Sequence, residues 1–258
     1  MPHLKVRGFV IREVQVGDAD RIINILTADL GLISVSARGA RRTKSPLLMP
    51  TQIFALSEFE LFANKGHYTV NTAELTEPFM ALHQDLDRLV CASHLAEVLL
   101  DCTRDAEPHL ELYQLWAFIM QALQSQPDPV FLTHLAQMRL LALIGYSPCI
   151  GSCVLCGAPL EGKTWFSIRS CGIICAKPAC RKQSSDALAL APGVLGCLNH
   201  CLNAPYGRLF NYRLSEEARR DFLLLSERYL THQMEKKYTR LKMLEGLDSL
   251  LSQPPQSH

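Results

Sequence analysis

The side chains most able to do chemistry are five cysteines that lie close together in the chain. Cys153 and Cys156 are separated by two residues, and Cys171, Cys175 and Cys180 follow after a gap. Two close cysteine pairs, about 15 to 25 residues apart, complete the tetrahedron of sulfur ligands that a structural Zn²⁺ ion prefers. The spacing predicts one such ion, held by Cys153 and Cys156 together with Cys175 and Cys180. The alternative second pair is Cys171 with Cys175.

Two cysteines separated by two residues also occur in thiol oxidoreductases, where the pair follows a strand and begins a helix. Here the sequence predicts that Cys153 and Cys156 follow a helix and enter a loop. Four cysteine ligands leave no open position on zinc, which favours a contribution to folding over catalysis by a zinc hydrolase. Cys149 is a spare thiol near the cluster and an alternative metal ligand. The remaining cysteines on predicted helices are expected to be buried and structural: Cys91, Cys102, Cys197 and Cys201.

Four cations within seven residues form a second chemical feature: Arg38, Arg41, Arg42 and Lys44. The small residues between them let a phosphate chain approach, and guanidinium groups bind phosphate oxygens through paired hydrogen bonds. On a barrel, such a loop borders the groove in which a nucleic-acid strand lies, with bases stacked on aromatic rings. We therefore expect these cations to bind DNA phosphates without reading sequence, the alternative being a solvated turn. Aromatic residues available for stacking, most of them expected in the core, are Phe9, Phe54, Phe59, Phe62 and Tyr68.

The scaffold of the basic loop is predicted to be a small β-barrel. β-branched or alternating runs indicate five short strands, at residues 6–12, 21–27, 32–36, 52–61 and 68–70. Short antiparallel strands avoid exposed edges when the sheet closes on itself. An OB-fold barrel is the simplest solution, and an SH3-like barrel fits the periodicity nearly as well.

Helical spacing of apolar residues replaces the strand pattern after Pro78. It predicts helices around residues 91–102, 112–123, 131–144 and 192–202, and Ser215 predicts the N-cap of a last long helix. The fold class is therefore α+β, with several domains. We expect an N-terminal OB-fold barrel (1–78), an α-helical domain in two parts (79–148 and 186–250), an inserted zinc module (149–185) and a disordered tail (251–258).

Composition excludes several classes of protein. The chain has 258 residues, of which 48% are hydrophobic, and a net charge of +1, so it is neither largely disordered nor uniformly basic. No apolar run approaches the roughly 20 residues of a membrane helix, and the N-terminus lacks the apolar stretch of a signal peptide. We therefore expect a cytoplasmic protein. The sequence contains no phosphate-binding P-loop, no His-Glu-x-x-His and no Gly-x-Ser-x-Gly motif.

Six segments of the chain resemble the bacterial RecO family of recombination mediators. They are VGDADRI (16–22), LTADLG (26–31), ARGARRTKS (37–45), LLALIGYSP (140–148), CVLCG (153–157) and CGIIC (171–175). The segments span most of the chain in the order in which the family has them. Asp18 stands where the family usually has Glu. Cys171 replaces the first glycine of the family's Gly-Gly-x-x lead, which aligns Cys175 as the third ligand.

The resemblance implies an OB barrel, a helical domain with an inserted zinc module, and a non-enzymatic role in recombinational DNA repair at the nucleoid. RecO-like proteins bind single- and double-stranded DNA, anneal complementary strands and act with RecR. They help RecA replace single-stranded DNA-binding protein on gaps. The alternative function is a protein-interaction scaffold with weak DNA contact. Its helical domain would hold the acidic, apolar tail of single-stranded DNA-binding protein in an apolar groove.

Overall fold

The structure is a computed structural model that describes residues 3–103 and 108–244. The chain forms two compact units, one comprising residues up to 86 and 96–125, the other 87–95 and 126 onward. Among the described helices, none is long and apolar enough to cross a membrane. The predicted disordered tail, residues 251–258, lies outside the described residues.

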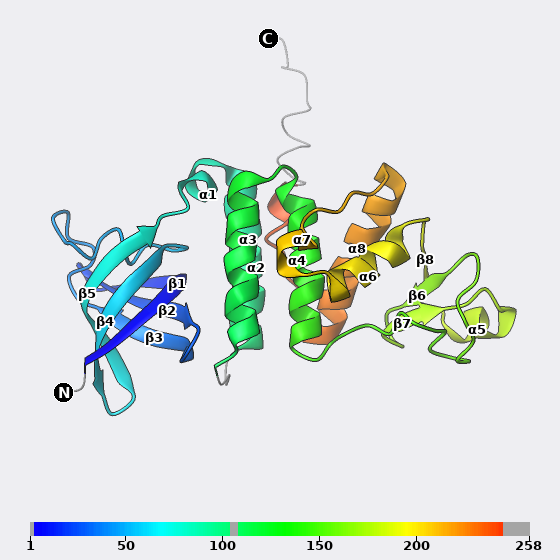
Figure 1. Cartoon of the computed structure of the whole chain (residues 1–258), viewed down its shortest axis with the longest axis horizontal. Helices are drawn as coiled ribbons and strands as arrows, with labels where there is room; N and C mark the ends of the chain where they lie inside the picture. Colours follow the sequence, from blue (N-terminus) through cyan, green and yellow to red (C-terminus); the bar gives the residue numbers. More distant parts are fainter. Residues whose placement is uncertain (1–2, 104–107, 245–258) are drawn as a thin grey trace, which may run out of the picture. The chain divides into compact units, whose positions relative to one another are not determined.

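A closed five-stranded barrel begins the first unit (Figure 1). Its strands are β1 (His3–Val16), β2 (Asp20–Thr27), β3 (Gly31–Ala37), β4 (Leu56–Asn64) and β5 (His67–Glu77). They close in the order β1-β2-β3-β5-β4, and β4 pairs back to β1. Neighbouring strands are antiparallel except β3 and β5, which pair in parallel. This crossover confirms the predicted OB-like barrel and decides against the SH3-like alternative.

Two strands differ in extent from the prediction. β4 begins at Leu56, although the apolar pattern begins at residue 52, because Phe54 has a left-handed backbone (φ 69°) that a strand cannot contain. β5 continues to Glu77, well past residue 70. Most of its side chains are exposed or half-buried, so the strand lacks the apolar alternation that would have revealed its length.

The barrel core packs tightly around Gly8, where β1 pairs with β2 on one side and β4 on the other. A Cβ atom at Gly8 would lie 2.4 Å from Cγ2 of Ile25 and 2.7 Å from the carbonyl oxygen of Leu26. Glycine is therefore required for this close approach of strands. The core itself is filled by Val10, Ile23, Ile25, Ile33, Val35, Phe59, Leu61 and Val70.

Helices complete the first unit. They are α1 (Met80–Gln84), α3 (Leu110–Ser125) and the part of α2 (Leu86–Cys102) from residue 96 on, whereas residues 87–95 of α2 belong to the second unit. The predicted apolar stripe of α3 is buried, with Trp116 only 1% exposed. The rings of Phe9 in β1 and Tyr113 in α3 have centroids 5.5 Å apart, so α3 packs against the barrel wall.

The second unit is built on α4 (Pro129–Leu143) and α8 (Glu216–Met234), with α6 (Val194–Asn203) and α7 (Tyr206–Leu209) beside them. α4 is buried along nearly its whole length, as its continuous apolar pattern predicts. Gln137 donates hydrogen bonds of 2.8 Å to the carbonyl oxygen and the hydroxyl of Ser226, which fixes α4 against α8. The hydroxyl of Ser215 accepts from the backbone N–H of Ala218, confirming the predicted N-cap of α8. α6 begins at Val194, so Pro192 precedes the helix.

A small cysteine-rich module follows α4 in the chain (Figure 1). It contains a three-stranded sheet in the order β7-β6-β8, formed by β7 (Gly172–Ile174), β6 (Trp165–Ser167) and β8 (Leu188–Ala189), and the short helix α5 (Pro178–Gln183). Such short strands carry no periodicity, so the sequence predicts only a loop-rich segment here. The ring of Phe166 lies 5.5 Å from that of Tyr229, edge to face, so β6 packs on α8.

Candidate functional site: a four-cysteine centre and a basic barrel loop

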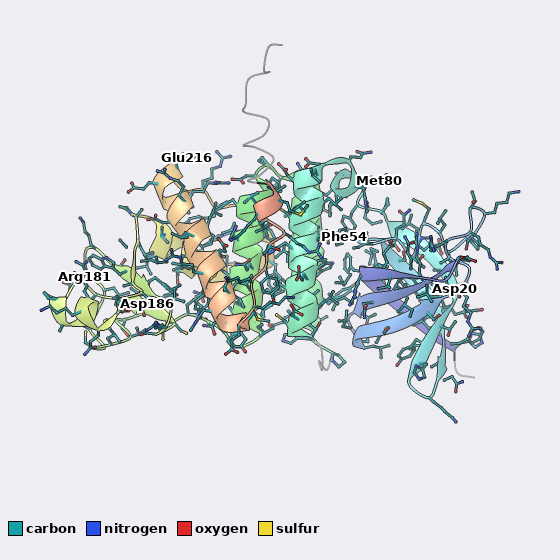
Figure 2. All side chains as sticks on the ribbon, turned by 180° about the vertical axis from the view of Figure 1, so that it is seen from behind. Asp20, Phe54, Met80, Arg181, Asp186 and Glu216 are labelled. Atoms are coloured by element: carbon teal, nitrogen blue, oxygen red, sulfur yellow. The ribbon has the colours of Figure 1, made fainter. Side chains whose placement is uncertain are left out.

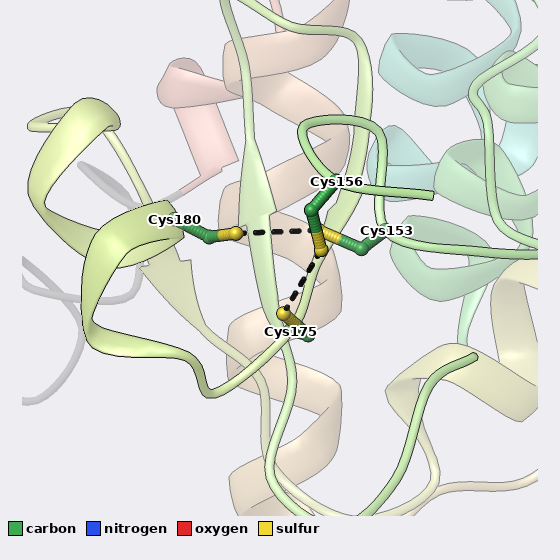
Figure 3. A group of neighbouring side chains, drawn as sticks. All are labelled: Cys153, Cys156, Cys175 and Cys180. Atoms are coloured by element: carbon green, nitrogen blue, oxygen red, sulfur yellow. Dashed lines mark hydrogen bonds between the residues drawn. The ribbon is translucent and has the colours of Figure 1, made fainter. Parts of the chain in front are cut away.

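The structure brings together the four cysteines chosen from their spacing: Cys153, Cys156, Cys175 and Cys180 (Figure 3). All four sulfurs lie within 4.8 Å of one another. The Sγ atoms of Cys153 and Cys180 are 3.9 Å apart, and those of Cys156 and Cys175 are 3.8 Å apart. Cys156 is exposed, whereas the other three are buried.

Backbone hydrogen bonds shape the first cysteine pair into a tight turn. The N–H of Gly157 donates to the carbonyl of Cys153 (2.8 Å), and the N–H of Cys153 donates to the carbonyl of Ala158 (2.9 Å). Val154 donates to the carbonyl of Ile173 (2.9 Å), which attaches the turn to β7 just before Cys175. Cys180 lies on α5 and completes the group from the other side.

The electrostatic environment of the centre acts in opposite directions on Cys153 and Cys180. Although burial opposes the charge, backbone N–H groups of Cys175, Leu155 and Cys156 lower the pKa of Cys153 to about 6. Burial and, after it, the neighbouring thiols raise the pKa of Cys180 to about 12, because several thiolates without a cation repel one another. A bound cation reverses that repulsion, since the thiolate is the form that binds metal.

These distances fit a zinc ion. Zn–S bonds of about 2.3 Å in a tetrahedron place the sulfurs about 3.8 Å apart, close to the two shorter separations in this group. A donor set of four thiolates is also typical of structural zinc. Among the described residues, neither Cys171 nor Cys149 joins the group.

The basic loop follows β3 and is held against the turn between β1 and β2. The N–H of Gly39 donates to Asp20 Oδ1 (2.7 Å), and the N–H of Arg41 donates to the carbonyl of Ala19 (2.8 Å). The guanidinium of Arg41 donates to the carbonyl of Gly17 (3.0 Å). Segments 16–22 and 37–45, which carry the family resemblance separately in the sequence, therefore form one surface; Asp20 marks it in Figure 2.

The four cations of the basic loop differ in their exposure to solvent. Arg38, Arg42 and Lys44 are exposed, whereas Arg41 is half-buried because it supports the turn. Ala40, between them, is fully buried in the barrel core. The loop is thus anchored at Ala40 and presents three free-standing cations to solvent.

Arg21 anchors the rest of the segment that links β3 to β4 from inside the protein. Its guanidinium donates to the carbonyl of Leu48 and to the hydroxyl of Thr51, both at 3.2 Å, and lies 3.5 Å from Glu13. Glu13 accepts from the N–H of Ile53 (3.2 Å). Sequence patterns do not reveal these anchoring roles, because they depend on residues about 30 to 40 positions apart that only the barrel brings together.

Most of the aromatic residues considered for base stacking are in the interior. Phe9, Phe54 and Phe59 are at most 2% exposed and therefore belong to the core. Phe62 and Tyr68 are half-buried, on β4 and β5. Any nucleic-acid contact at the basic loop would thus be dominated by phosphate.

The cysteine module carries its own exposed cations. Arg181 on α5 stacks over the ring of Trp165, 4.3 Å from its centroid (Figure 2 labels Arg181 and Asp186). Although burial opposes it, hydrogen bonds from the N–H of Arg169 and the hydroxyl of Ser184 lower the pKa of Asp186. Asp186 therefore acts as a structural acceptor for the turn that precedes β7.

The chain is a multidomain α+β protein that combines an OB-like barrel, a helical unit and a four-cysteine group able to hold a metal ion. Residues 1–79 match the family model described as "Recombination protein O N terminal", and residues 83–242 match "Recombination protein O C terminal". The chain belongs to the RecO family of DNA repair proteins.

Relatives in other bacteria agree over nearly the whole chain. The DNA repair protein RecO of Acetivibrio thermocellus is 36% identical over 251 residues, which cover 97% of this chain and 99% of that protein. That of Listeria welshimeri is 32% identical over 215 residues, or 83% of each chain. That of an Anaeromyxobacter species is 28% identical over 254 residues, or 97% and 99%.

Proposed function

We propose that this protein is a non-enzymatic recombination mediator that acts in recombinational DNA repair in the cytoplasm, at the nucleoid. It binds single- and double-stranded DNA and anneals complementary strands. With RecR, it helps RecA load on gaps coated with single-stranded DNA-binding protein. One zinc ion, held by Cys153, Cys156, Cys175 and Cys180, stabilises the cysteine module.

The observation that carries this proposal is the basic loop. Arg38, Arg42 and Lys44 extend from an anchored turn on a closed barrel, and Arg41 is beside them. Phosphate oxygens bind strongly to guanidinium groups presented in this way. Because the neighbouring aromatic rings are mostly buried, binding is expected to depend on charge, to be insensitive to base sequence and to weaken steeply with salt.

Fluorescence anisotropy of labelled single-stranded and double-stranded DNA, measured across a salt series, tests the proposal. Arg38→Ala/Arg42→Ala removes two exposed cations and leaves Arg41, which supports the turn. Each lost phosphate contact reduces the slope of log affinity against log salt by about 0.7 for single strands, so the double variant loses about 1.4.

Lys5→Ala/Arg7→Ala is the matched control, because it removes two exposed cations of β1, outside the loop. The control should keep the wild-type slope. Equal slopes in all three proteins would show that DNA does not bind at the loop, and no binding by the wild type at low salt would overturn the proposal.

A second function, the protein-interaction scaffold, is favoured by a cavity in the second unit. It has a volume of about 430 Å³. Its lining combines apolar side chains, including Leu223, Leu224 and Leu241, with the cations Arg220 and Lys242, and the carboxylate of Glu227 lies 3.3 Å from the Lys242 ammonium. This combination suits an acidic, apolar peptide such as the tail of single-stranded DNA-binding protein.

A labelled tail peptide titrated with the protein tests this function. Leu224→Glu and Arg220→Glu place negative charge at exposed positions of the cavity and should each weaken binding about tenfold or more, since like charges and lost apolar contact both oppose the peptide. Arg213→Glu changes an exposed cation that does not line this cavity and is the control. If all three variants bind the peptide equally, this cavity is not the tail site.

A further inference from the structure

Two thiols outside the four-cysteine group lie next to each other in the second unit. Cys149 follows α4 along the chain and is exposed, and Cys171 lies in the turn before β7 and is half-buried. The N–H of Cys149 donates to the carbonyl of Cys171 (2.9 Å), and the N–H of Ile173 donates to the carbonyl of Cys149 (2.9 Å). Cys149 is thereby paired in parallel with Gly172.

This pairing places the two cysteines at disulfide range. Paired residues on neighbouring strands have Cα atoms about 4.8 Å apart, and one step along the chain adds about 3.3 Å, so the diagonal Cα separation is about 6 Å. Disulfides form when Cα atoms are about 4.4 to 6.8 Å apart. Gly172 leaves room for the Cys149 side chain, because a Cβ on Gly172 would lie 2.8 Å from that of Cys149.

The sulfur of Cys171 contacts polar groups of α8 and of its own turn. The side-chain amide of Gln233, on α8, donates to Cys171 Sγ at 3.0 Å. The same sulfur lies 3.6 Å from the carbonyl oxygen of Ile168 and 3.9 Å from that of Arg169, and its thiolate is the form that attacks an oxidant. Burial raises the pKa of Tyr229, and Cys171 and Cys149 both contribute to the rise. That hydroxyl donates to the carbonyl of Tyr146 (3.1 Å).

The backbone of Cys171 also has an unusual conformation. Its φ of 52° is left-handed, a conformation that a cysteine adopts at a cost and that glycine adopts freely. A β-carbon at this position is therefore not favoured by the turn itself.

We propose that Cys171 and Cys149 form a reversible disulfide when the protein meets hydrogen peroxide, with Cys171 as the attacking thiol and Cys149 as the resolving thiol. The Cys171 thiolate attacks one peroxide oxygen, the O–O bond breaks, and Cys171 sulfenic acid and one water form after proton uptake. The Cys149 sulfur then attacks the sulfenic sulfur, so the S–S bond forms, the S–O bond breaks and a second water leaves. Two thiols lose two electrons and two protons, and one peroxide is reduced to two waters.

The disulfide fastens the segment after α4 to the turn before β7. It also draws Cys171 Sγ away from Gln233 and so changes a contact between the cysteine module and α8. A dithiol reductant restores both thiols by exchange.

The experiment treats the full-length protein, as purified, with hydrogen peroxide and quenches samples over time by alkylation. Tandem mass spectrometry then locates the disulfide, and a metal-binding dye follows release of zinc. We expect a Cys149–Cys171 crosslink, with a mass loss of about 2 Da, before any zinc is released. Zinc release or oxidation of the four-cysteine group before the crosslink appears would overturn the proposal.

Variants separate the two roles. In Cys149→Ser the resolving thiol is missing, so a sulfenic-acid probe should label Cys171 at least about tenfold more than in the wild type. Gln233→Leu should slow oxidation of Cys171 about three- to tenfold, the range expected for one hydrogen bond to an anionic sulfur. Cys102→Ser is the control, because burial, with the charge of Asp101, raises the pKa of Cys102 to about 12 and makes that thiol unreactive. Unchanged labelling in Cys149→Ser would refute the resolving role, and an unchanged rate in Gln233→Leu would refute activation of Cys171.

Discussion

His134 gives the second unit a stability that depends on pH. The side chain is buried within α4 at 6% exposure, and its Nδ1 has no hydrogen-bond partner among the described residues. Burial, together with the nearby charges of His94 and Arg219, lowers the pKa of His134 from 6.5 to about 3. The folded protein therefore keeps this imidazole neutral at pH values where the unfolded chain protonates it.

The sign and size of the effect follow from proton linkage. Between pH 6.5 and pH 3 the unfolded state binds more protons than the folded state, so acid stabilises the unfolded state. The free energy of unfolding falls by about 1.4 kcal/mol for each pH unit below 6.5. From pH 7.5 to pH 4.5 the loss from His134 alone is about 2.5 kcal/mol.

Urea unfolding followed by circular dichroism, at several pH values from 7.5 to 4.5, measures this loss. His134→Leu cannot take up a proton, so its advantage over the wild type should grow by about 2.5 kcal/mol across the range. Comparing the two proteins at each pH cancels acid effects that they share, including protonation of the cysteine centre. His232→Leu, an exposed position on α8, is the control and should parallel the wild type. A constant difference between wild type and His134→Leu would refute the reasoning.

Four further predictions concern the metal centre and the barrel. Purified protein should release one zinc ion per chain to a strong chelator and lose thermal stability. Cys153→Ser should contain less than half the wild-type zinc by metal analysis, because three thiolates bind more weakly than four; full zinc content in the variant would contradict this. Gly8→Ala should lower the free energy of unfolding by about 2 to 3 kcal/mol in urea titrations, since its Cβ would collide with Ile25 and with a backbone oxygen. Arg21→Met should lower the free energy of unfolding by about 3 kcal/mol, because it leaves the Glu13 carboxylate without its guanidinium partner. Hydrogen exchange should also increase in residues 46–55, which Arg21 contacts at Leu48. Unchanged exchange there would show that Arg21 does not hold this segment.

Local sequence patterns determined the strands, most of the helices and the first cysteine pair of this protein. Alternating and β-branched runs predicted the five strands, and apolar residues at helical spacing predicted α3, α4 and the N-cap of α8 at Ser215. These features depend on neighbours within a few residues, which is the range that periodicity and capping report. The spacing of Cys153 and Cys156 likewise indicated metal chemistry, since a close pair of thiols is itself a local structure.

The tertiary structure decided what local pattern leaves open. The parallel pairing of β3 with β5 separates an OB-like from an SH3-like barrel, and strand periodicity is the same in both. Cys180 joins the four-cysteine group and Cys171 does not, because α5 and the turn before β7 point their sulfurs in different directions, toward the group and toward Gln233. The turn after β1 supports the basic loop through bonds between residues about 20 positions apart. Contacts of this kind exist only after the chain has folded, so no short segment of sequence records them.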